Sequence, residues 1–372
     1  MFITLPLIAL SSSCKGRLDP EDGMAEDKSA PISFVVGQDT KGTRPIDDKE
    51  TLARYGFGVY AGYTQPGVKF GSGSQAANYM KNTKIEQDPK SPDKWIASNQ
   101  FYWPINGSLS FFGYAPYFKQ QDADANGQSF IIPSKDYKGG LLRGTYKPDP
   151  NVTTQLDLCL SIPVLDRLSS EGPVPMNFKH ALTRVFFFVN GLGADSDRFR
   201  YRVTDIYLKG VVGTNTVTYV MDEDVPFEWD PIRDTTARDG EYHLTYNRDQ
   251  PHLTDSWVKV SSDSHEASKM ENFVKINSTD NGRLYLLPQE LTDDATVQIV
   301  LTAYTLTGSS WTIISELPPV EYKLPRGAAW EPSKTISYFA TIDIPNLCVF
   351  DMTAYKTDWE DSGNVFDPQF ID

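Results

Sequence analysis

The sequence has few cysteines, few histidines and fewer basic than acidic residues. Of 372 residues, 3 are Cys and 4 are His, and 35 Lys and Arg stand against 49 Asp and Glu, which gives a formal net charge of −14. Cys14, Cys159 and Cys348 do not have the spacing of metal ligands. An acidic chain also lacks the basic surface that binding to a phosphate backbone needs, so we expect no nucleic acid partner.

Long apolar runs and catalytic motifs are missing as well. No stretch after residue 14 is apolar over the roughly 18 residues that a membrane-spanning helix needs. His180, His243, His252 and His265 lie outside any HExxH pattern, and the chain has neither a GxSxG elbow nor a P-loop. A Ser-His-Asp constellation need not be contiguous, but nothing in the sequence favours one. We therefore predict no enzyme, no cofactor and no catalytic residue.

The residues that are abundant favour β-structure. The chain has 19 Tyr, 20 Phe and 7 Trp, with 26 Gly and 25 Pro to form turns. Apolar residues recur with a period of two, as in FGVYAGY at 57–63, VQIVLTAYTL at 297–306 and TISYFATIDI at 335–344. RVFFFVNGL at 184–192 is apolar on both faces, which is typical of a strand covered on both sides. This pattern predicts an all-β fold of β-sandwiches, with no long helix beyond a turn in ANYMKN.

A break in the pattern at LSSEGPVPMN, residues 168–177, suggests a division of the chain. We expect a signal peptide at 1–13, a polar, flexible tether at 14–31 and a first β-sandwich domain at 32–172. A second β-sandwich domain is expected at 173–345, followed by a C-terminal tail at 346–372.

The first residues read MFITLPLIALSSSC, an apolar run followed by small residues and a cysteine. This order resembles a bacterial lipoprotein signal, in which cleavage before Cys14 leaves the thiol to carry lipid, including palmitate. A plain secretory signal or a buried N-terminal strand are the alternatives. Attachment by several acyl chains would hold the protein firmly at a membrane.

Two groups of residues invite a chemical interpretation. Asp122, Asp124 and Asn126 in DADANG match the first half of a calcium loop, but Pro133 replaces the bidentate Glu, so a solvated acidic loop is favoured and we assign no metal. Cys159 and Cys348 could pair in an oxidising compartment, although two buried thiols without a disulfide are favoured.

Several strings, in their order and spacing, resemble the fimbrillin (Mfa-like) family of type V pilus subunits from anaerobic gut and oral bacteria. They are ISF with the Thr43-Arg44 pair, FGVYAGY, NYMKN, WIASNQFYWPINGSLSFFGYAP, NFKHALTRVFFFV, LYLLPQEL and AWEPSKTISYFATI. Trp103, Trp330 and His180 lie in these strings, so we interpret the first two as structural and His180 as a hydrogen-bonded structural residue.

The resemblance implies two transthyretin-like β-sandwiches in series, export as a lipoprotein to the outer membrane, and assembly with other fimbrial subunits by strand addition. In that scheme an Arg-specific protease removes the first strand, here ISFVV at 32–36. Arg54 is the favoured processing site, because Pro45 follows Arg44 and hinders cleavage there. The alternative is that both are uncleaved loop residues.

The same resemblance places the donor strand in the C-terminal tail, where Val349, Tyr355, Trp359 and Phe366 are apolar anchors. It leaves open whether the subunit belongs to the stalk or the tip. A different possibility is a lipid-anchored surface adhesin or glycan-binding accessory protein that binds a host protein or glycan without polymerising.

Overall fold

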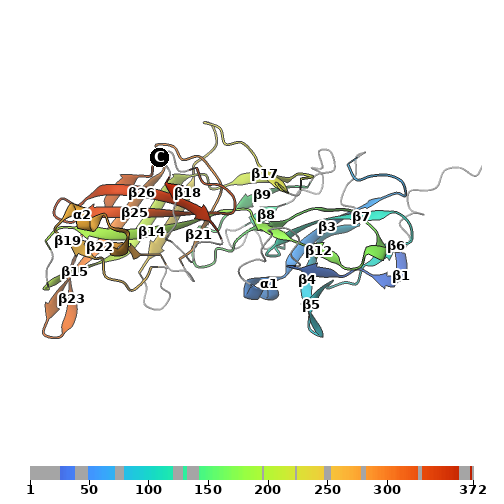
Figure 1. Ribbon diagram of the computed structural model, residues 1–372, viewed down its shortest axis with the longest axis horizontal. Helices are drawn as coiled ribbons and strands as arrows, with labels where there is room; N and C mark the ends of the chain where they lie inside the picture. Colours follow the sequence, from blue (N-terminus) through green and yellow to red (C-terminus); the bar gives the residue numbers. More distant parts are fainter. Residues whose placement is uncertain are drawn as a thin grey trace, which may run out of the picture.

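The computed structural model describes residues 26–37, 49–71, 79–119, 129–131, 142–194, 197–222, 224–246, 253–277, 282–325, 329–359 and 369–370. Strands predominate among them, and the helices are short (Figure 1). None of the helices in these ranges has the length and apolarity needed to cross a bilayer. The predicted all-β fold is confirmed.

The strands of the first part of the chain are β1 Glu26–Pro31, β2 Phe34–Val36, β3 Phe57–Thr64, β4 Met80–Asp88, β5 Ser91–Ala97, β6 Tyr102–Pro104, β7 Ser108–Ala115, β8 Ser129–Ile131, β9 Arg143–Lys147, β10 Cys159–Ser161, β11 Val164–Arg167, β12 Val174–Met176 and β13 Phe178–His180. The later strands are β14 Thr183–Leu192, β15 Phe199–Val211, β16 Asn215–Tyr219, β17 Phe227–Trp229, β18 Gly240–Thr245, β19 Val260–Ser261, β20 Val274–Lys275, β21 Leu284–Leu286, β22 Thr296–Thr307, β23 Ser310–Glu316, β24 Val320–Lys323, β25 Lys334–Asp343, β26 Cys348–Asp358 and β27 Gln369–Phe370. The helical segments are α1 Lys49–Tyr55, α2 Ser264–Ala267 and two short 3-10 turns, η2 Ser169–Glu171 and η3 Met270–Asn272.

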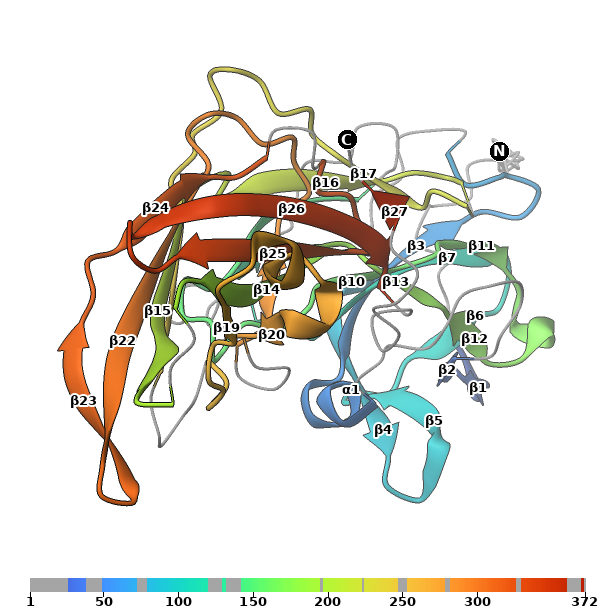
Figure 2. The same ribbon diagram turned by 60° about the vertical axis from the view of Figure 1, so that its left-hand side comes forward.

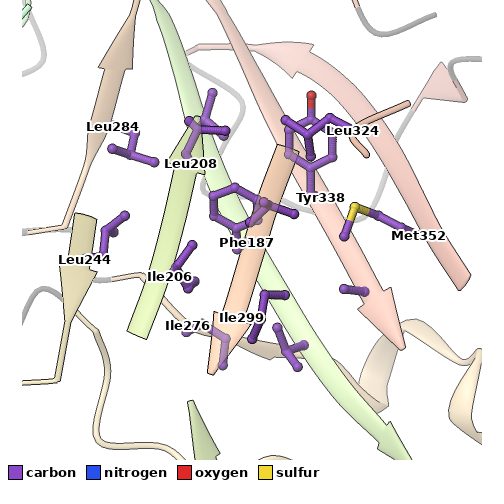
Figure 3. Packing of buried hydrophobic residues seen from close by; sticks show 14 of the residues in the cluster. Phe187, Ile206, Leu208, Leu244, Ile276, Leu284, Ile299, Leu324, Tyr338 and Met352 are labelled. Atoms are coloured by element: carbon purple, nitrogen blue, oxygen red, sulfur yellow. The ribbon is translucent and has the colours of Figure 1, made fainter. Parts of the chain in front are cut away.

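At one end of the elongated molecule, two sheets pack face to face around the largest apolar core (Figure 1). One sheet has the order β19-β14-β25-β26-β27, and the other has the order β18-β15-β22-β23. Alternate residues of β14, β25, β15 and β22 point between them, including Phe187, Tyr338, Ile206 and Ile299 (Figure 3). The period-two pattern of the sequence therefore identifies the inward face of each long strand.

At the other end, the sheet β12-β2-β5-β4-β3-β7-β10-β13 buries both faces of its strands β3 and β7. Phe57, Val59 and Ala61 of β3 enter one apolar cluster. Tyr60 of the same strand enters another cluster on the opposite face. The second cluster is covered by a four-stranded sheet of order β17-β16-β9-β8. Because both faces are covered, β3 is buried along its whole length.

The sheets do not follow the expected division at residue 172. β12 and β13, at residues 174–180, pair with β2 and β10 of the first part of the chain. β16, at residues 215–219, pairs with β9, at residues 143–147. Strands from both sides of the expected boundary therefore share two sheets.

Three local predictions differ from the structure. Met80–Asn82 of ANYMKN begin strand β4 rather than a helical turn, since they pair with β3. The segment 26–31, which we expected to belong to the tether, forms β1 against β6. The segment 348–358, which we expected to be a tail, forms β26 in register with β25 from Lys334↔Asp358 to Asp343↔Cys348.

Candidate assembly interface

Strand β2 is an interior strand of its sheet. It pairs in parallel with β12, through Val174↔Phe34, and in antiparallel with β5, through Phe34↔Trp95. The Val174 amide donates to the Ser33 carbonyl at 2.9 Å, and the Ile32 amide donates to the Phe101 carbonyl at 2.8 Å. Removal of β2 would thus leave two strand edges, each with unpaired backbone groups, facing a gap.

Two side chains of residues 32–36, Ile32 and Phe34, lie within the apolar cluster that also contains Phe57 and Phe111. Phe34 is 0% exposed and Ile32 is 1% exposed. The Phe34 ring makes edge-to-face contacts with Phe57 and Phe111, at centroid separations of 6.0 and 5.8 Å. The predicted removable strand therefore carries core residues, and its loss would open an apolar groove lined by aromatic rings.

Arg54 lies in the last turn of α1, beside β4, with an exposed side chain (Figure 1). The helix ends where the Gly56 amide donates to the Leu52 carbonyl at 2.8 Å, with Gly56 at φ +69°. Leu52 is 5% exposed and belongs to the same cluster as Phe34. Cleavage after Arg54, once the last helical turn has opened, would cut the chain between the segment that holds β1, β2 and Leu52 and the strands that follow.

The predicted donor anchors occupy places within the chain's own fold. Val349 packs on the large core, and Tyr355 packs beside Phe339 at 5.1 Å between ring centroids. Trp359 is 2% exposed. β27 pairs with β26 through Tyr355↔Phe370. Phe366 lies outside the described residues. The anchors up to Trp359 are therefore not exposed tail residues.

The Trp359 ring closes a junction between the two ends of the molecule. It stacks on the His180 imidazole at 4.3 Å and on the Tyr285 ring at 5.5 Å. Arg184 lies over the same ring at 4.6 Å and donates to the Trp359 carbonyl at 2.6 Å. Ser333 donates its hydroxyl to the His180 carbonyl at 2.7 Å. The end of β26 is thereby held against β13.

His180 is hydrogen-bonded, as predicted, through its Nδ1 to the carboxylate of Asp157. The Sγ of Cys159 lies 3.6 Å from the same nitrogen and 3.1 Å from Asp157 Oδ2. Asp157, Cys159 and His180 therefore form one cluster. No local sequence motif marks this cluster, because His180 is distant in sequence and comes opposite Cys159 only through the pairing of β10 with β13.

The remaining predicted site residues are not brought together. Cys14, Arg44, Asp122, Asp124 and Asn126 lie outside the described residues. No disulfide joins Cys159 to Cys348, as we favoured. The expectation that both are buried was wrong for Cys348, which is exposed at the start of β26. Trp103 and Trp330 are buried, 4% and 2% exposed, as expected of structural residues.

The fold and the interior position of β2 define a class of β-sandwich protein, and comparison with known proteins identifies the family. A family model described as fimbrillin-like matches residues 43–359, so the chain belongs to the fimbrillin-like family. No curated protein matches the sequence.

One solved structure shares the fold, and others are matched more distantly. A fimbrial protein from Bacteroides vulgatus has a TM-score of 0.64 and 20% identity, with 88% of this chain and 99% of that chain covered. A candidate cell adhesion protein from Bacteroides uniformis has a TM-score of 0.46 and 14% identity, with 89% and 99% covered.

Proposed function

We propose that this chain is a structural subunit, of the stalk or the tip, of a cell-surface fimbrium that assembles by exchange of strand β2. Membership of the fimbrillin-like family supports the fimbrial part of the proposal. The observation that carries the exchange step is the interior position of β2 between β12 and β5, with Phe34 in the strand and Ile32 just before it fully buried. Loss of β2 leaves a groove with apolar walls and two open strand edges, which is a template for strand addition.

The route to assembly has three further steps. The chain is exported as a lipoprotein and held at the outer membrane by lipid on Cys14. An Arg-specific protease then cuts after Arg54, or after Arg44, and releases the N-terminal segment. A C-terminal segment of a neighbouring subunit enters the vacated groove. Because β26 is built into the large core and β27 pairs at only two positions, we assign the donor role to residues 360–372.

The test is to treat the purified chain with an Arg-specific protease. Intact mass and N-terminal sequencing locate the cut, and denaturant-resistant ladders with light scattering report assembly. We expect a cut after Arg54 followed by high-mass ladders. Arg54→Gln should stay intact and monomeric, with Arg44→Gln as the matched control. Clean removal of the N-terminal segment without any gain in mass would refute the exchange step.

A second candidate is a lipid-anchored adhesin that binds a host protein or glycan without polymerising. The observation that favours it is the β22–β23 hairpin, which projects from the molecule (Figure 2) and leaves Ile313 67% exposed and Ile314 50% exposed. In that case the intact monomer binds its partner, and Ile313→Asp abolishes binding while cleavage at Arg54 has no effect on it.

A further inference from the structure

We propose that Asp157, Cys159 and His180 form a binding site for a divalent transition-metal ion of the zinc class. The inference does not depend on fimbrial assembly. Asp157 and Cys159 are two residues apart along one extended segment, and Cys159 pairs directly with His180 across the β10–β13 ladder. Directly opposite residues in such a ladder share a face, so the register brings Cys159 and His180 together. Asp157 lies just before β10, and its carboxylate joins them through contacts with Cys159 Sγ and His180 Nδ1.

The donor atoms converge at distances that suit one ion. The Cys159 Sγ, His180 Nδ1 and one Asp157 oxygen all lie within 4.8 Å of one another. Tetrahedral zinc with ordinary Zn–S and Zn–N bond lengths separates sulfur and nitrogen by about 3.5 Å. The observed separation of Cys159 Sγ from His180 Nδ1 is 3.6 Å. The Asp157 oxygen would need to move away from both other donors, to about 3.3 Å from His180 Nδ1 and from 3.1 Å to about 3.5 Å from Cys159 Sγ.

The burial of these three side chains favours a state with a bound cation over a state in which only hydrogen bonds hold them. Cys159 is 2% exposed, and the side chains of His180 and Asp157 are 12% and 14% exposed. The hydrogen bonds from Cys159 and His180 both go to Asp157 Oδ2. Asp157 Oδ1 is buried and has no hydrogen bond within the described part of the chain. A buried carboxylate oxygen without a partner is costly, and a cation held by this carboxylate would offset that cost.

The chemistry of the donors selects the ion. A thiolate, an imidazole and a carboxylate together are typical ligands of zinc, and not of calcium or magnesium, which prefer oxygen. Three protein ligands leave a fourth position for water. Because the His180 ring also stacks on Trp359, an ion bound at Nδ1 would fix the ring orientation at the junction that holds the end of β26.

The experiment uses the full chain in a Cys14→Ser/Cys348→Ser variant, in which Cys159 is the only cysteine. One sample is treated with a chelator and titrated with Co²⁺. A second sample is loaded with Zn²⁺ and dialysed, and its Zn²⁺ content is measured by elemental analysis. We expect one Zn²⁺ per chain. We also expect a sulfur-to-cobalt charge-transfer band with the visible bands of tetrahedral cobalt, both displaced by Zn²⁺.

Further exchange of Cys159→Ser in that variant should abolish the charge-transfer band and weaken Zn²⁺ binding more than about 100-fold, since outer-shell partners alone change affinity by about 10–100-fold. Asp157→Asn, which keeps the size of the side chain, should weaken binding while the fold persists by circular dichroism. If the Cys159→Ser variant does not fold, the cobalt spectrum of the single-cysteine chain is by itself the test of the proposal. Absence of the band there, or Zn²⁺ binding that survives Cys159→Ser, overturns the proposal and leaves a hydrogen-bonded trio.

Discussion

Phe34 illustrates what single residues contribute and what the sequence predicts of them. Its string, ISFVV, is apolar enough to predict a strand but too short for periodicity to assign a face, and the role of removable strand came only from the family resemblance. The structure gives the physical reason for its role, because the Phe34 ring meets Phe57 and Phe111 in the middle of the core. Full burial of a phenylalanine stabilises a fold by about 3–5 kcal/mol relative to alanine, so β2 is held in place strongly until it is cut.

Gly56 gives a prediction at the same scale. Its φ is +69°, and a Cβ there would lie 2.4 Å from the Ile85 carbonyl oxygen. Gly56→Ala should therefore destabilise the fold by more than the roughly 1–2 kcal/mol of a left-handed alanine, because β4 must also shift. Gly67 has φ +77° with nothing within 4 Å of such a Cβ, so Gly67→Ala is the matched control. If urea unfolding showed an equal loss of unfolding free energy in Gly56→Ala and Gly67→Ala, the contact with Ile85 would be unimportant.

The lowered pKa of Lys275 leads us to expect that stability depends on pH. Burial, together with the nearby Arg184 and Arg283, lowers its pKa from 10.5 to about 8. Its ammonium lies 3.4 Å from the centre of the Phe186 ring. Between these two pKa values the unfolded chain binds more protons than the folded chain, so the free energy of unfolding should rise from pH 8 to about 9.5.

The rise is smaller than the full pKa shift implies, because part of the side chain is reached by solvent. Urea unfolding at pH 8 and at about pH 9.5 should show this rise in the free energy of unfolding in the wild type and not in Lys275→Met. The comparison stays below pH 10 because burial also raises the pKa of tyrosines such as Tyr338. A rise of the same size in Lys275→Met would assign it to other groups.

At the scale of elements, the apolar patterns of the sequence located the long strands well, because each of these strands buries at least one face in a core. β3, β14, β22 and β25 match the predicted runs. β26 was missed as a strand because Asp351, Lys356 and Asp358 dilute its alternation, and only Met352 and Ala354 are buried. β1 and β4 were missed for a similar reason, since their sequences are mostly polar, and in β4 only Met80 and Ile85 are buried.

The structure of β26 gives a prediction about the C-terminal segment. Deletion of residues 346–372 removes β26 and buried Trp359, so it should unfold or strongly destabilise the large sandwich. Deletion of residues 360–372 leaves β26 and Trp359 in place and should change the melting temperature little. Thermal unfolding of both truncated chains separates these effects. A folded, stable chain without residues 346–372 would contradict the assignment of β26 to the core.

At the scale of the whole molecule, composition and pattern predict a β-sandwich protein, but not how its sheets share strands. The expected boundary at 172 rested on Pro and Gly in LSSEGPVPMN. The pairings of β12 with β2 and of β16 with β9 join residues far apart in sequence, and no local signal encodes them. The Asp157–Cys159–His180 cluster could not be predicted for the same reason, since strand register alone brings His180 to the other two.

The central claim is that the groove beneath β2 accepts a strand from outside. A specific protease site is placed between Gly37 and Lys49, the chain is cut, and the N-terminal segment is washed off in mild denaturant. Binding of a labelled peptide of residues 26–37 is then measured by fluorescence anisotropy. We predict one peptide bound per chain, loss of binding when the peptide carries Phe34→Asp, and competition by a peptide of residues 360–372. A cut chain that binds no peptide, or binds the Phe34→Asp peptide equally well, would contradict the account.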